Sequence, residues 1–161
     1  MYIRKIGIQD NAPLKKIIQD SLKSLGLAIP GTAYFDPELG ALAEYYARRA
    51  HAQYWVVENE AGVILGGCGI APFDEGKKIC EFQKLYLVPQ AKGLGLGKKL
   101  MHHALEFADK YYDSCYLETS SSLTSAIHLY DYFGFTQLKA PLDGSPHAAM
   151  DRWYITHTPF L

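Results

Sequence analysis

The chain has 161 residues, of which 48% are hydrophobic and 20% charged, and its formal net charge is −1 at pH 7. This length suffices for one compact domain with its own core, so we expect a single domain over residues 1–161. The near-zero net charge does not favour broad electrostatic binding to nucleic acid or to an anionic membrane, and no apolar run approaches the ~20 residues that span a bilayer.

The first part of the chain predicts a strand, two helices and three further strands. A short strand is expected over residues 2–7, followed by a helix that Asp10 or Asn11 could cap, with apolar residues at helical spacing from Leu14 onward. A second helix is expected to begin at Asp36-Pro37, because proline suits a first turn. Strands are then expected over residues 54–58, 63–71 and 79–88.

Strict alternation along the strand over residues 79–88 divides its side chains between two faces. One face is expected to carry Glu81, Gln83, Leu85 and Leu87. The other is expected to carry Cys80, Phe82, Lys84 and Tyr86.

The second part of the chain predicts a helix, a strand, a second helix and two closing strands. Helices are expected from Lys98 to about Tyr112 and from Ser125 to Phe133, where Gly134 suits a left-handed position after the helix. Strands are expected over residues 114–119, 135–138 and 150–155. The order β-α-α-β-β-β-α-β-α-β-β predicts the α/β (α+β) class, with a mixed sheet of about seven strands and helices on both faces.

Three alternating glycines connect a predicted strand to a predicted helix in Lys92-Gly93-Leu94-Gly95-Leu96-Gly97-Lys98. Glycine lets a backbone approach a ligand closely, and the following helix directs its free N–H groups at the loop, so we expect a phosphate or diphosphate site. A P-loop is excluded, because it would require glycine at position 92 and Ser or Thr at position 99. A dinucleotide-binding fingerprint fits poorly, because Lys98 and Leu100 stand where it has Gly or Ala.

The same loop resembles motif A of the GNAT superfamily of N-acetyltransferases, [QR]-x-x-G-x-[GA], with Lys92 in place of Gln or Arg. A second match lies downstream, where Ala126-Ile127-His128-Leu129-Tyr130-Asp131-Tyr132-Phe133-Gly134-Phe135 resembles the family signature A-x-x-L-Y-x-x-x-G-F. The predicted element order is also that of the family. Two departures are Lys92, which lacks the fork of arginine, and Ser122-Leu123-Thr124, where many members carry asparagine.

This resemblance implies acetyl-CoA as the donor. Its diphosphate would bind the backbone amides of the loop, to which the resemblance assigns Lys92, Gly93, Leu94, Gly95, Leu96, Gly97 and Lys98. Its pantetheine arm would pair with the backbone of Leu85, Tyr86 and Leu87, where the family's sheet opens. One backbone N–H from Leu85 or Leu87 would polarise the thioester carbonyl.

The resemblance also implies roles for four side chains. Glu81 stands where family members with a glutamate base carry it, although a surface or salt-bridged glutamate is the alternative. An unperturbed Glu near pKa ~4.3 is a poor match for an amine near ~10.4, so burial or a water chain would be needed. Tyr130 stands at the general-acid position, with a purely structural core tyrosine as the alternative. Tyr34 and Phe35 would border the acceptor pocket, which the loop over residues 141–147 could also line.

We therefore expect a cytoplasmic N-acetyltransferase that moves an acetyl group to a primary amine by direct attack in a ternary complex. The acceptor would be a small-molecule amine or a peptide N-terminus, and a homodimer is possible. The alternative is a non-catalytic acyl-CoA-binding regulatory module. Cys68, Cys80 and Cys115 lie in apolar segments, which favours buried reduced thiols. No metal is expected, because no His or Cys pair has ligand spacing, and the remaining histidines, including His147, are isolated in sequence.

Overall fold

Seven strands form one mixed sheet in the computed structural model, which describes all of residues 1–161. The spatial order of the strands is β1-β2-β3-β4-β5-β7-β6, and all neighbours are antiparallel except β4 and β5. Their bounds are β1 (Tyr2–Lys5), β2 (Gln53–Glu58), β3 (Ile64–Asp74), β4 (Ile79–Leu87), β5 (Ser114–Thr119), β6 (Thr136–Leu138) and β7 (Arg152–His157). The predicted fold class is confirmed.

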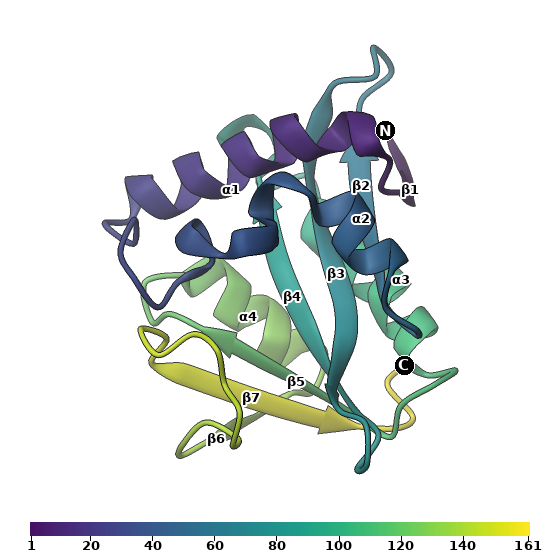
Figure 1. The fold of residues 1–161 in the computed structure, drawn as a ribbon, viewed down its shortest axis with the longest axis vertical. Coiled ribbons are helices and arrows are strands. Elements are labelled where there is room, and N and C mark those ends of the chain that lie inside the picture. The colour runs from purple at the N-terminus through teal and green to yellow at the C-terminus, as the bar shows by residue number, and fades with distance from the viewer.

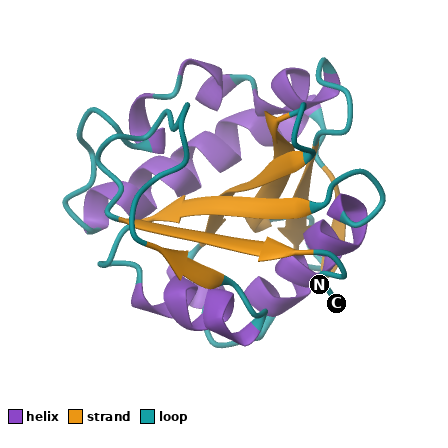
Figure 2. Cartoon of the chain, turned by 90° about the horizontal axis from the view of Figure 1, so that it is seen from below, coloured by secondary structure: helices purple, strands orange, loops and turns teal.

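Helices cover both faces of this sheet (Figures 1 and 2). In Figure 1, α1 (Asn11–Ser24) and α2 (Leu42–Ala47) lie in front of the sheet, and α3 (Leu96–Ala108) and α4 (Thr124–Tyr132) lie behind it. Each layer has its own apolar core, because each helix buries one side against the sheet. None of the helices combines the length and the apolar character required to cross a bilayer.

Two helices differ in extent from the sequence prediction. A 3-10 turn over Pro37–Gly40 precedes α2, because Ala41 leaves the helical region at φ −142°. The third helix begins at Leu96 instead of Lys98, directly after a left-handed residue, and it ends at Ala108 instead of about Tyr112. Apolar residues of both helices, among them Leu42, Tyr46 and Leu105, are nevertheless buried.

Two acidic side chains hold loops together in ways the pattern did not predict. Asp10 caps no helical N–H; its carboxylate accepts a hydrogen bond from the Gly7 amide at 2.7 Å and pairs with Arg4 at 2.7 Å. Asp151 accepts a hydrogen bond from the Ser121 amide at 2.7 Å, which ties it to the turn after β5. The last strand therefore begins at Arg152, later than predicted.

One extra residue in β4 forms a bulge. Gly69 of β3 pairs with Gln83, but Gly67 pairs with Tyr86, so three steps along β4 match two along β3. Lys84 adopts φ 52°, the left-handed conformation that such an insertion requires.

The predicted alternation of β4 side chains is wrong beyond this bulge, because an inserted residue exchanges the two faces. Leu85 and Leu87 pack with the core under α3 and α4, whereas Tyr86 packs with the core under α1 and α2. Lys84 also points toward the α1 and α2 side, where it meets Asp36. The bulge thus places Glu81, Lys84 and Tyr86 on one face.

Two buried tyrosines hold the bulged strand from the α2 side. The Tyr54 hydroxyl donates to the Lys84 carbonyl at 2.8 Å, and the Tyr46 hydroxyl donates to Gln83 Oε1 at 2.6 Å. Gly69 makes room for both rings, because a Cβ there would lie 2.6 Å from Tyr46 Oη and 2.8 Å from the Tyr54 ring. A side chain at this position would therefore displace the tyrosines that fix the bulge.

Beyond the bulge, β4 separates from its parallel neighbour β5. The two strands pair only from Ile79 and Ser114 to Glu81 and Tyr116, although β4 continues to Leu87. Figure 1 shows β4 and β5 diverging from a common end. The far half of β4 thus has no strand partner on the β5 side.

Replacing Gly69 with alanine is expected to lower the free energy of unfolding by about 1–3 kcal/mol, because the new methyl group overpacks the tyrosine pair. Urea denaturation followed by circular dichroism measures this change. Gly76→Ala is the matched control, since the nearest atom to its new Cβ is 3.5 Å away, and it should change stability by less than about 0.5 kcal/mol. Equal effects in the two variants would contradict the packing argument.

Candidate functional site

The glycine loop presents a row of free backbone amides. From Gly93 to Lys98, no backbone N–H donates to an acceptor in the protein, and the first intrahelical bond runs from the Lys99 amide to the Gly95 carbonyl at 3.2 Å. Gly93 and Gly95 have φ of 79° and 73°, and a Cβ at either would meet only open space. Six successive donors, at the positive end of the α3 dipole, are suited to binding an anion.

Neighbouring residues hold this loop in place. Ala91 and Leu96 are buried on either side of it, whereas Leu94 is exposed. Gly97 differs from the other two glycines, because it lies within α3 and has no positive φ. A Cβ there would make an ordinary contact with Leu129 of α4 at 3.6 Å, so helix packing does not require glycine at this position.

The lysines around the loop divide into two kinds. The Lys98 ammonium lies 3.8 Å from the centre of the Tyr132 ring, a cation–π contact at the start of α3. Lys92 and Lys99 are exposed and form no ion pair. Both are free to contribute positive charge near the amides.

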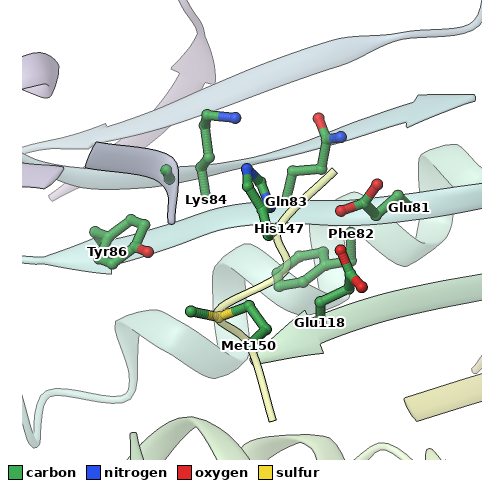
Figure 3. Close-up of a pocket in the computed structure, with 9 residues that line it drawn as sticks. Glu81, Phe82, Gln83, Lys84, Tyr86, Glu118, His147 and Met150 are labelled. Carbon is green, nitrogen blue, oxygen red and sulfur yellow. The ribbon is translucent and has the colours of Figure 1, made fainter. Parts of the chain in front are cut away.

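A small polar cavity of about 40 Å³ lies beside β4 on the α1 and α2 side (Figure 3). Glu81 lines it and is only 5% exposed. Burial, and secondly the nearby Glu118 carboxylate, raise the pKa of Glu81 to about 7. Such a carboxyl group exchanges a proton near neutral pH, as a general base must.

Glu118 on β5 faces Glu81 across this cavity. Its Oε2 accepts a hydrogen bond from the Tyr116 hydroxyl at 3.0 Å and a second one from the Ser145 hydroxyl. Its Oε1 is buried and has no hydrogen-bond partner. A buried carboxylate oxygen without a donor is costly, so its position calls for a ligand.

A buried ion network forms another wall of the cavity. The Lys84 side chain is 3% exposed, and its ammonium lies 2.7 Å from Asp36 and 3.4 Å from Glu38. His147 Nε2 lies 2.9 Å from the same Asp36 carboxylate. Burial opposes both charges, but the Asp36 carboxylate outweighs it, and the pKa values of Lys84 and His147 are raised. The network ties the loop over residues 139–151 to the segment before α2.

Tyr130 is buried on α4 behind the opening in the sheet. Its ring centroid lies 6.4 Å from that of Phe82, which also lines the cavity, and 5.8 Å from that of Tyr154. Burial raises the pKa of Tyr130, so its phenol is protonated at neutral pH. Phe82 therefore contacts Tyr130 and also lines the cavity that contains Glu81, whereas Tyr130 does not line it.

The predicted acceptor contacts lie to one side of this cavity. Tyr34 packs partly into the α1 core, and Phe35 is 58% exposed with its ring edge-on to Tyr34 at 5.0 Å. Neither lines the cavity, although the adjacent Ala33 does. His147, the last residue of the loop over residues 141–147, lines this cavity, and the role of that loop at an acceptor pocket stays a prediction.

Sequence reasoning missed Glu118, Lys84, Asp36 and His147 as site residues. His147 is isolated in sequence, because its partner Asp36 is 111 residues away in the chain. Glu118 gave one usable signal: it is a carboxylate in the strand Ser114–Thr119, whose other residues are all buried.

One set of side chains has the composition of a metal site. Donor atoms of Glu81, Glu118 and His147 all lie within 4.8 Å of one another. However, His147 Nε2 is bound to Asp36, and the Lys84 ammonium lies on the same network. These neighbours oppose a dication, and the absence of a metal stays a prediction.

Comparisons with known proteins agree on one family. A family model described as the acetyltransferase (GNAT) family matches residues 19–135. The N-acetyltransferase YjgM of Escherichia coli strain K12 is 40% identical over 148 residues, which cover 90% of this chain and 87% of that protein. A GNAT acetyltransferase structure from Staphylococcus aureus Mu50 has a TM-score of 0.85 at 20% identity and covers 97% of this chain and 98% of its own. The PaiA N-acetyltransferase of Thermoplasma acidophilum, solved with coenzyme A, has a TM-score of 0.73 at 19% identity, with coverage of 97% and 98%.

Proposed function

The chain belongs to the GNAT family of acetyltransferases, and on that premise we propose that it transfers an acetyl group from acetyl-CoA to a primary amine. The family supports acyl transfer from a CoA thioester. One observation carries the finer proposal: β4 presents the Glu81 carboxyl group at its paired end and leads, at its open end, into the free amides of the glycine loop. A base and an anion site on one strand fit a long donor that lies along it.

The residues of this chain fit the donor in two places. The six amides from Gly93 to Lys98 would hold the diphosphate, with Lys92 as a nearby cation. The open edge of β4 at Leu85, Tyr86 and Leu87 would pair with the pantetheine amides, as a peptide adds to a sheet edge. A coenzyme A complex of the structurally similar PaiA enzyme supports this use of the fold.

Glu81 is the proposed base. Its ionised carboxylate accepts a proton from the bound ammonium, and the neutral nitrogen then attacks the thioester carbonyl carbon. A C–N bond forms and the C–S bond breaks, with the electron pair passing to sulfur, and the acylated nitrogen releases its second proton to solvent. A backbone N–H of Leu85 or Leu87 would stabilise the negative charge on the carbonyl oxygen.

Tyr130 is the proposed acid. Its protonated phenol would donate to the departing sulfur of coenzyme A and be reprotonated from solvent. Because its pKa lies above that of a free thiol at ~8.5, complete proton transfer is unfavourable, and hydrogen bonding to the thiolate would be the larger part of its effect.

The size of the cavity and the state of the cysteines bear on the acceptor and on the location of the protein. We propose a small-molecule amine or a peptide N-terminus as the acceptor, because the cavity beside Glu81 is small. We also propose a cytoplasmic location, which the three buried free cysteines support.

A thiol-release assay with acetyl-CoA and a panel of primary amines tests the function and its base together. For the wild type, kcat/KM is expected to rise as the pH increases through about 7, since only the ionised Glu81 accepts a proton. Glu81→Gln should remove this acidic limb and lower kcat by about 10²–10⁴-fold. The control is Glu106→Gln, an exposed residue of α3. No release of coenzyme A with any amine would defeat the proposed function.

Gly95→Val is expected to weaken acetyl-CoA binding at least ~10-fold by calorimetry, because the side chain enters the space in front of the amides. Gly62→Val is the matched control: Gly62 has φ 77° against 73° for Gly95, and both face open space. Both variants should lose a similar ~1–2 kcal/mol of stability to left-handed strain. If Gly62→Val weakened binding equally, strain alone would explain the result.

Tyr130→Phe is expected to lower kcat by about 10²-fold or more while leaving the acetyl-CoA dissociation constant within about twofold. The phenylalanine keeps the ring contacts with Phe82 and Tyr154. Steady-state kinetics and calorimetry on the same preparation measure both values. Unchanged turnover would remove Tyr130 from the mechanism.

A further inference from the structure

Two carboxyl groups converge on the cavity without a cation of their own. Glu81 forms no ion pair, and Glu118 Oε1 is buried without a hydrogen-bond partner. Figure 3 shows the two groups pointing toward each other from β4 and β5. Two carboxylates this close repel each other unless a proton or a cation lies between them.

Two hydroxyl groups hold the Glu118 carboxylate in one orientation before any ligand binds. Hydroxyl groups of Tyr116 and Ser145 both donate to Oε2, and Oε1 of this cavity-lining residue is the oxygen left without a donor. Tyr116 comes from β5 and Ser145 from the 139–151 loop, so the carboxylate is held from two sides. A group positioned in this way loses little entropy when it binds a ligand.

The cations that line the cavity are already paired. The Lys84 ammonium is shared by Asp36 and Glu38, and His147 is bound to Asp36. The titratable groups around the two carboxyls are Lys84, His147, Tyr46, Tyr86 and Tyr116. None of the tyrosines adds a positive charge. Lys84 and His147 also lower the pKa of Glu81, but both are shared with Asp36, and the effect of Glu118 on that pKa exceeds the effect of either cation. The cavity therefore keeps an excess of negative charge.

We propose that Glu118 binds the ammonium group of the acceptor beside Glu81, and that the enzyme thereby selects primary alkylamines with no carboxylate on the carbon that bears the nitrogen. This inference rests on the proposed function and names its acceptor class. The cavity of about 40 Å³ accommodates one ammonium-sized group. A carboxylate on the adjacent carbon would face Glu81 and Glu118 without a free cation to receive it.

The two carboxylates then have different tasks. One ammonium proton passes to Glu81, and the nitrogen lone pair so released forms the bond to the acetyl carbon. Glu118 keeps a hydrogen bond to a remaining N–H and orients the nitrogen. Since Glu118 contacts the acceptor before and after proton transfer, its loss should affect KM more than kcat.

Glu118→Gln tests this assignment, with the best amine of the panel as acceptor. We expect KM for the amine to rise about 10–100-fold, as for loss of a hydrogen bond to a charged group, with a much smaller change in kcat. The acidic limb of kcat/KM should move to lower pH, because the negative neighbour that raises the pKa of Glu81 is gone. The acetyl-CoA dissociation constant should not change, and Glu106→Gln should match the wild type throughout. If Glu118→Gln does not fold, Ser145→Ala provides a second test. It removes one donor to Glu118 and should raise KM for the amine by a smaller factor.

A pair of acceptors tests the selectivity. Pentylamine and 2-aminohexanoate share one carbon chain and differ by a carboxylate beside the nitrogen; each is assayed as a substrate or as a competitive inhibitor of the best amine. The wild type should bind pentylamine at least ~10-fold more tightly than 2-aminohexanoate, and Glu118→Gln should reduce this difference in affinity. If the enzyme acetylates amines but 2-aminohexanoate binds equally well, or Glu118→Gln leaves KM unchanged, this inference fails and the proposed function stands. No turnover of any amine by the wild type would overturn both.

Discussion

The bulge in β4 is the constraint on which the site depends. One extra residue, Lys84 in a left-handed conformation, exchanges the faces of the strand and turns Lys84 and Tyr86 toward the same side as Glu81. Without it, the Lys84 ammonium would point into the apolar layer under α3, where no carboxylate could neutralise it. The insertion also accompanies the separation of β4 from β5, which leaves one edge of the strand unpaired. The bulge thus brings the buried Lys84 ammonium to the side of the sheet that carries Glu81.

Around the cavity, the cations have ion-pair partners, whereas Glu81 and Glu118 have none. Asp36 serves two cations, Lys84 and His147, so both positive charges are stabilised by one neighbouring segment. The carboxyl groups of Glu81 and Glu118 receive no such partner and are left to influence each other. Breaking a buried pair of this kind costs about 3–5 kcal/mol, and the network therefore also fixes the 139–151 loop against the rest of the domain. The Asp36 carboxylate thus neutralises two cations and also holds the 139–151 loop in place.

Local features of the sequence predicted the parts of the site that local physics determines. The glycine loop was recognisable because positive φ and a following helix leave a signature within nine residues, and its free amides are present as expected. Resemblance to a family located Glu81 and Tyr130, whose catalytic roles stay predictions. The bulge was not predicted, because the alternation of apolar and polar residues along β4 gives no sign of an inserted residue. Glu118 and His147 escaped because their neighbours come from strands and loops up to 111 residues away, and only the folded chain brings them together.

The 139–151 loop has a consequence for how this protein could diversify. It touches the acceptor side through Ser145 and His147, and its backbone is anchored by bonds from the Ala149 amide to the Gly31 carbonyl and from the Leu142 amide to the Tyr116 hydroxyl. None of its residues accepts a hydrogen bond from the amides of the glycine loop. Under the proposed function, substitutions in this loop would change which amine is accepted and leave the donor site unchanged, so the two specificities could evolve independently.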